Sequence, residues 1–169
     1  MFELFKRETM AAGSVLFRGN LPPRPQEFDY LRKLGVEIRP GSDHGDAHWS
    51  LELRHKDWGD AKLVALRGAP APPRQMLTWY AALTDEERDL AAASASSVSI
   101  SVNSKKKNVL RDRKHLLRFA RSIMGGDGVL VADHTSQLFW SRSMLDDELA
   151  HDADLDITAI YCVHAVGAN

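Results

Sequence analysis

The chain has 169 residues, of which 44% are hydrophobic and 27% charged, and its formal net charge is −1. This composition excludes a largely disordered chain, and the near-neutral charge excludes a global attraction to nucleic acid or membranes. No apolar run approaches the roughly 18 residues of a membrane-spanning helix, and the single Cys162 excludes an internal disulfide. We therefore expect a folded cytoplasmic protein without membrane contact.

The first half of the chain alternates between strand-like and helix-like segments. Between the first two strands, Phe28, Leu31 and Leu34 recur at helical spacing, and Gly35 follows as a C-cap. The last two strands form a hairpin, because side chains alternate in polarity and a turn sequence separates them. The predicted strands cover residues 14–18, 36–38, 48–55 and 61–66.

Residues 68–73 contain three prolines and are the best candidate for an internal linker. A helix is predicted over 74–83. A second helix is predicted to begin after Thr84 and to run to about Ala93, because Thr84 and Glu87 have the spacing of a capping box.

The second half has clearer periodicity. Strict alternation predicts a strand over 98–102, and an apolar stripe predicts a helix over 109–124 that ends at two glycines. The apolar run 128–132 is typical of a strand covered on both faces. Further elements are a short strand at 137–140, a helix capped by Ser141, and a strand at 157–166 that must pair with another strand.

These elements predict an α+β fold in which helices pack against a mixed sheet. We expect one domain over residues 1–169, with a subdivision near 68–73. The recurrence of strand, helix and hairpin in both halves raises the alternative of two similar α/β halves.

Charge is strongly segregated in the second half. Residues 105–121 carry eight basic side chains against the single Asp112, and residues 127–156 carry eight acidic side chains against the single Arg142. The basic side chains on the predicted helix recur three and four residues apart and share one face, which we expect to be exposed while Leu117 and Met124 are buried. The candidate anion-binding residues are Lys105, Lys106, Lys107, Arg111, Lys114, Arg118 and Arg121. The alternative is a solvated helix face paired with the acidic segment.

The loop at 43–48 is the densest cluster of potential metal ligands, namely Asp43, His44, Asp46 and His48. Its spacing matches no established metal motif. An ordinary loop and strand end is the alternative, and we assign no metal or cofactor.

No catalytic constellation is predicted. Cys162 and His164 fall on one face of the last strand, where a free cysteine is usually a core residue. The sequence Asp133–Ser136 predicts a turn, because Asp133 and Ser136 are typical turn residues. A catalytic relay is not expected there, because side chains adjacent in sequence do not converge as a relay requires. The tryptophans Trp49, Trp58, Trp79 and Trp140 are expected to be buried or partly buried, with a pocket lining as the alternative.

Residues 128–133, followed by Leu138-Phe139-Trp140-Ser141 and Leu145, resemble a recurring segment of uncharacterised bacterial cytoplasmic proteins in domain-of-unknown-function families. The resemblance covers about residues 96–166 and implies a fold and a compartment but no chemistry. Members often continue into a region with a His-Thr-His-Gly-Leu motif, which this sequence lacks. The chain would then be a truncated form or a shorter relative.

We expect a non-enzymatic binding or protein-interaction module of a bacterial cytoplasmic protein, whose partner is another protein or another domain of the same protein. The first alternative is a polyanion or nucleic-acid binder that uses the basic helix 105–121. The second is a metal-dependent hydrolase at the 43–48 loop.

Overall fold

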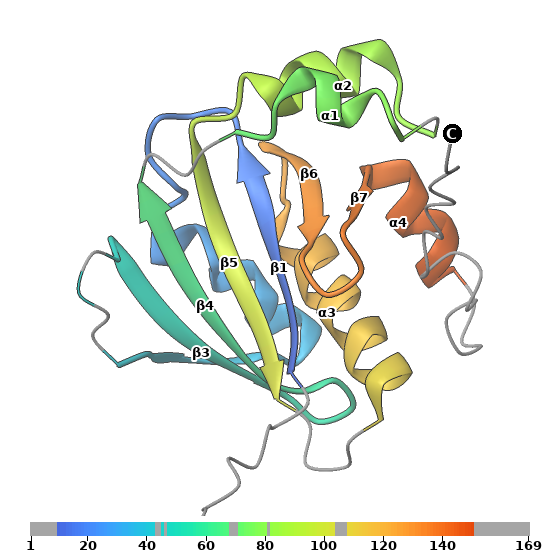
Figure 1. Ribbon diagram of the computed structural model, residues 1–169. Coiled ribbons are helices and arrows are strands. Elements are labelled where there is room, and N and C mark those ends of the chain that lie inside the picture. Colours follow the sequence, from blue (N-terminus) through green and yellow to red (C-terminus); the bar gives the residue numbers. More distant parts are fainter. Residues whose placement is uncertain are drawn as a thin grey trace, which may run out of the picture.

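The computed structural model describes residues 10–42, 45, 47–67, 71–80, 82–103 and 108–150. Within these residues the chain forms one seven-stranded sheet with helices packed against it, so the α+β class is confirmed (Figure 1). We expected a mixed sheet, and every pairing among the described strands is antiparallel. The predicted strand at 157–166 lies outside the described residues.

The sheet has the strand order β2-β3-β4-β5-β1-β6-β7. Its strands are β1 (Met10–Phe17), β2 (Glu37–Pro40), β3 (Trp49–His55), β4 (Gly59–Arg67), β5 (Ser96–Asn103), β6 (Gly128–Asp133) and β7 (Leu138–Trp140). Every residue of β5 pairs with β4, from Asp60↔Asn103 to Arg67↔Ser96. The strands before and after the proline-rich segment 68–73 are therefore neighbours in one sheet.

The helices are η1 (Pro25–Leu34), α1 (Arg74–Leu77), α2 (Asp85–Ala92), α3 (Val109–Ile123) and α4 (Arg142–Leu149). The capping box of α2 is present, because Thr84 Oγ1 accepts the Glu87 N–H at 3.2 Å and Glu87 Oε2 accepts the Thr84 N–H at 2.8 Å. Ser141 caps α4 as predicted.

Two helix predictions need correction. Segment 25–34 is a 3-10 helix, although it ends at Gly35 in the left-handed region as expected. The helix predicted over 74–83 has only four residues, Arg74–Leu77. Beyond Leu77, the Trp79 and Tyr80 N–H groups donate to the carbonyls three residues back, each at 3.2 Å, so the four-residue spacing of α-helical hydrogen bonds does not continue.

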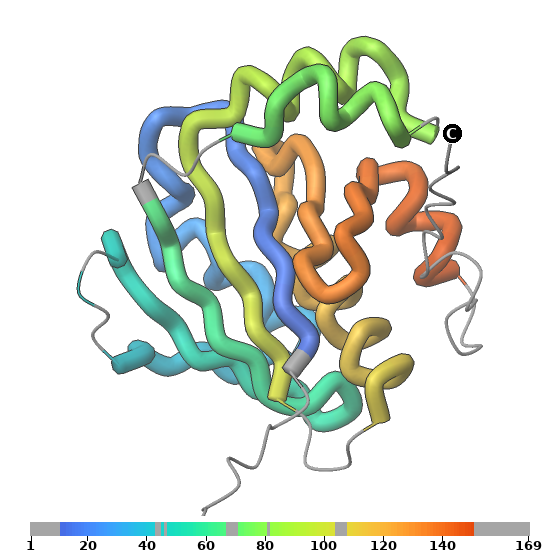
Figure 2. The backbone as a smooth tube through the Cα atoms, in the orientation of Figure 1, coloured from blue at the N-terminus to red at the C-terminus, as the bar shows by residue number. Residues whose placement is uncertain are grey.

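Helices cover the two faces of the sheet unequally. One face carries the main core, and α3 packs against β1, β5, β4 and β6 there with η1 and α4 beside it (Figures 1 and 2). On the other face, the helices of the described chain cover only one end, where α1 and α2 enclose a second cluster around Leu16, Leu77 and Leu130. We call this second side of the sheet the open face.

Candidate functional site

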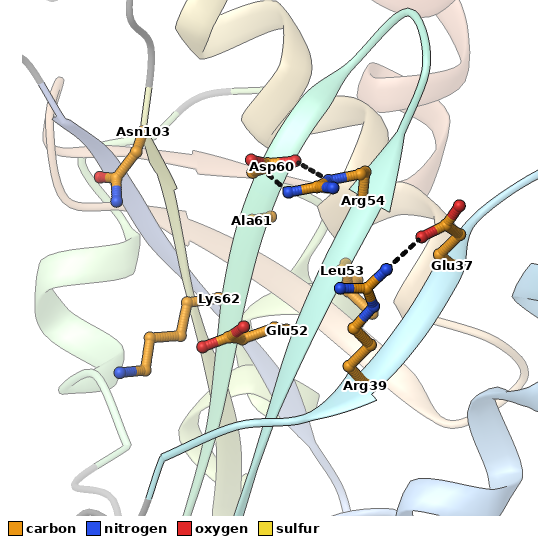
Figure 3. A pocket seen from close by; sticks show the side chains of 9 residues that line it. All are labelled: Glu37, Arg39, Glu52, Leu53, Arg54, Asp60, Ala61, Lys62 and Asn103. Carbon is orange, nitrogen blue, oxygen red and sulfur yellow. Dashed lines mark hydrogen bonds and ion pairs between the residues drawn. The ribbon is translucent and has the colours of Figure 1, made fainter.

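One end of the open face is a balanced array of charges. Six charged side chains from β2, β3 and β4 form two cross-strand rows, Glu37–Arg54–Asp60 and Arg39–Glu52–Lys62. Each cation has a carboxylate as its neighbour in the adjacent strand, and Figure 3 shows the ion pairs that Arg54 forms with Asp60 and Arg39 with Glu37, at 2.9 and 3.1 Å. Because opposite charges alternate, this end of the face has no net charge with which to attract a polyanion.

The other end of the open face is a largely apolar hollow of about 710 Å³, which we call the α1 groove. Its floor includes Ser14 and Leu16 on β1, Ser97 and Ser99 on β5, and Ala132 on β6. Its walls come from the α1 region and from the β6–β7 turn with β7, and they include Met76, Trp79, Tyr80, His134, Gln137 and Phe139. The hollow lies within the roughly 300–1,000 Å³ range of ligand pockets.

Hydrogen bonds fix the position of the α1 wall. Arg88 on α2 donates from Nε to the Leu77 carbonyl at 3.2 Å and from Nη2 to the Tyr80 carbonyl at 2.9 Å. The Tyr80 ring packs edge-on against Phe139 with a centroid distance of 5.0 Å, and its hydroxyl donates to the Gln137 carbonyl. The two walls are thereby joined to each other across one edge of the groove.

Trp79 is the most exposed large apolar side chain among the described residues, with 70% of its surface accessible. Our expectation that all four tryptophans would be buried or partly buried is wrong here and confirmed for Trp49, Trp58 and Trp140. Trp79 lies two residues after the end of the four-residue α1, in a turn rather than on a packed helix face. The alternative of a pocket lining holds for Trp79.

The floor of the α1 groove contains a polar cluster. Ser14 Oγ lies 3.2 Å from Ser99 Oγ and 2.8 Å from Nε2 of His134. Ser14 and Ser99 are directly opposed on neighbouring strands, and His134 enters from the turn that follows β6. No local pattern in the sequence indicates this cluster, because 85 and 120 residues separate Ser14 from its two partners.

The turn that carries His134 is held from three sides. Asp133 Oδ1 accepts the Thr135 and Ser136 N–H groups at 3.0 and 3.1 Å, which confirms the predicted turn. The His134 N–H donates to the Ala12 carbonyl at 3.0 Å. Beneath the turn, buried Arg113 on α3 donates to Asp133 Oδ2 and to Ser136 Oγ. The imidazole therefore extends from a rigid support.

The basic helix does not present the exposed face that we expected. Arg111 is exposed, but Lys114 is buried and Arg118 and Arg121 are half-buried, while Leu117 and Met124 are buried as predicted. The helix α3 packs on the sheet and also contacts η1 and α4, so a smaller part of its surface is exposed to solvent than we expected. The remaining candidates, Lys105, Lys106 and Lys107, lie outside the described residues.

The acidic segment supplies a partner for one of these cations. Arg121 donates from Nε to Asp146 Oδ1 at 2.5 Å and from Nη2 to Oδ2 at 3.1 Å. This hydrogen-bonded ion pair lowers the pKa of Asp146 below its ordinary value. For Arg121, the alternative prediction that the basic helix pairs with the acidic segment is therefore confirmed.

Of the candidate metal ligands, Asp43, His44 and Asp46 lie outside the described residues, and His48 is exposed just before β3. Within the described residues no group of three or more His, Cys, Asp or Glu side chains is arranged to hold a metal ion. Nearby His55 is a packed residue: its Nδ1 accepts the Asp57 and Trp58 N–H groups at 3.2 Å, and its ring stacks on Trp58. Cys162 and His164 also fall outside the described part.

His115 on α3 makes stability depend on pH. Burial and then the nearby cations Arg118, Arg111 and Lys114 lower its pKa from 6.5 to about 4. The unfolded chain takes up a proton near pH 6.5 while the folded protein resists it, so stability is complete above that pH and falls as the pH drops towards 4. After allowance for solvent screening we expect a loss of about 1–2 kcal/mol.

Urea unfolding of wild type and of His115→Gln at pH 7.5 and pH 4.5 tests this expectation. The variant should lose less stability between the two pH values than the wild type. Equal losses in both proteins would show that His115 does not titrate differently on unfolding.

No family model, curated protein or solved structure matches this chain. None of the helices in the described part of the chain is both long and apolar enough to cross a bilayer.

Proposed function

We propose that this chain is a non-enzymatic protein-interaction module that binds an uncharged, apolar segment of a partner protein in the α1 groove. The observation that carries the proposal is the exposed Trp79 beside a hollow of about 710 Å³. Tryptophan exposed at the edge of an apolar hollow is typical of residues that dominate binding energy in protein interfaces.

The charges of the groove support a neutral occupant. In the described part of the chain its lining contains no Lys, Arg or Glu, and its one carboxylate, Asp133, is buried against Arg113. The other end of the open face has balanced charges and would neither attract nor repel a charged partner strongly. A segment with an aromatic or aliphatic side chain therefore fits this site better than an anion does.

Polyanion binding through 105–121 has less support. Lys114 is buried and Arg121 is paired with Asp146, which leaves Arg111 as the exposed cation of α3 among the candidates in the described residues. The bacterial cytoplasmic setting remains a proposal that rests on the single cysteine and on the resemblance over 96–166.

Selection from a phage-displayed library of random peptides tests the interaction. We expect the full chain to enrich peptides with aromatic or large aliphatic side chains and without clustered charge. Synthetic copies of those peptides should bind Trp79→Ala roughly tenfold or more weakly than wild type, because truncation of a central aromatic residue removes most of its contact.

Leu34→Ala is the matched control, since Leu34 is another exposed apolar side chain but lies on η1 outside the groove. It should bind the selected peptides as the wild type does. Failure to enrich any peptide, or equal affinity of Trp79→Ala and wild type, would contradict the proposed function.

A further inference from the structure

We propose that Ser99, Ser14 and His134 are the polar anchor of the α1 groove and that they recognise the peptide groups of the bound segment. This inference rests on the proposed function and adds to it the chemistry of recognition. The three side chains form a continuous chain across the floor, with contacts of 3.2 and 2.8 Å that meet at Ser14 Oγ.

The chain can run in either of two directions. If His134 carries its proton on Nδ1, Ser99 donates to Ser14, Ser14 donates to His134 Nε2, and the Nδ1–H is free to donate elsewhere. If the proton is on Nε2, His134 donates to Ser14, Ser14 donates to Ser99, and the Ser99 hydroxyl keeps the free donor. Either direction leaves one donor and several lone pairs available.

A peptide group has both an N–H and a carbonyl, so it needs one acceptor and one donor from its site. The hydroxyl and imidazole chain supplies both without a fixed charge. A carboxylate or phosphate would instead require cationic donors, and no Lys or Arg lines the groove in the described residues. The anchor therefore favours neutral amides over anions.

The anchor is rigid before a ligand binds. Ser14 lies on β1, which pairs with β5 on one side and with β6 on the other. The His134 turn is fixed by Asp133, Arg113 and the Ala12 carbonyl, as described above. Such preorganisation reduces the entropy that a ligand must lose on binding.

A Ser–His contact also raises the possibility of nucleophilic catalysis. That role requires a group that orients the imidazole and donors that stabilise an oxyanion. In the described part of the chain no carboxylate is hydrogen-bonded to His134. Ser14 is moreover in the middle of a strand rather than on a sharp turn that would expose its hydroxyl. Recognition is therefore the assignment that the geometry favours.

Nuclear magnetic resonance titration of the full chain with N-acetyl-L-phenylalaninamide tests the anchor. This probe combines one aromatic side chain with two peptide groups, and a ligand of its size is expected to bind with a Kd on the order of 1 mM. The amide signals of Ser14, Ser99 and Ala132 and the indole signal of Trp79 should shift together.

Ser14→Ala and Ser99→Ala should each weaken probe binding by roughly three- to tenfold, as expected for one lost neutral hydrogen bond. The matched control is Ser101→Ala, because Ser101 is two residues further along β5 on the same face but outside the groove. It should bind as the wild type does, and dispersed spectra would show that all three variants fold.

Three results would overturn the anchor. The first is unchanged affinity in both Ser14→Ala and Ser99→Ala while Trp79→Ala weakens binding, which leaves the proposed function intact. The second is the absence of shifts in the groove while library peptides bind there. The third is covalent attachment of a fluorophosphonate probe to Ser14, which would assign the serine and histidine to nucleophilic catalysis.

Discussion

Arg113→Ala is expected to lower the free energy of unfolding by about 3–5 kcal/mol, because it leaves the carboxylate of Asp133 buried without its counterion. Asp133 has a fully buried side chain, and Arg113 is almost as inaccessible. Urea unfolding at pH 7.5 measures the loss. The same variant should also weaken binding to the α1 groove, because the pair supports the turn that carries His134.

Two further variants separate burial from charge pairing. Arg54→Ala removes an arginine from an exposed ion pair with Asp60 and should cost far less, since water screens that pair. The double variant Arg113→Met with Asp133→Asn removes both charges of the pair and keeps an oxygen that can accept the Thr135 and Ser136 N–H groups, so it should recover much of the lost stability. Equal losses in Arg113→Ala and Arg54→Ala would contradict the importance of the buried pair.

Gly128→Ala is expected to destabilise the protein by about 1–3 kcal/mol through overpacking. A Cβ atom at Gly128 would lie 2.6 Å from both Cα and the carbonyl oxygen of Met124, which is far inside contact distance. Neither atom can move without shifting the end of α3, because the Gly128 N–H also donates to that carbonyl at 2.7 Å. Urea unfolding again gives the difference.

Gly126→Ala is the matched control for that prediction. A Cβ atom there would meet nothing within 4 Å, and Gly126 is not in the left-handed region, whereas Gly125 has a φ of 51°. We expect a change within about 0.5 kcal/mol. A large loss in Gly126→Ala, or none in Gly128→Ala, would show that the turn after α3 is constrained in some other way.

Local signals predicted most of the secondary structure. The capping residues Thr84 and Ser141, the alternation in β3 and β5, and the stop at Gly35 act over a few residues and are visible in the sequence. The helix at 74–83 was predicted too long because hydrophobic periodicity does not distinguish α-helical hydrogen bonds from the three-residue hydrogen bonds that follow α1.

The candidate site could not be predicted in the same way. Trp79 was expected to be packed because tryptophan is mostly buried, but it lies in the turn after α1 and is exposed. The basic face of α3 was expected to be exposed, because spacing along a helix shows which side chains share a face. It does not show which other elements pack against that face. Lys114 belongs to that face and is buried.

By itself, the sequence determined the α+β class, the order of the strands and helices in the described chain, and most of their ends, since these depend on contacts between nearby residues. The tertiary structure alone decided the order in which the strands lie side by side in the sheet, and this order forms the site. The α1 groove unites Ser14, Ser99 and His134 because β1 pairs with both β5 and β6. Such pairings between distant segments depend on packing of the whole sheet, and no local pattern specifies them.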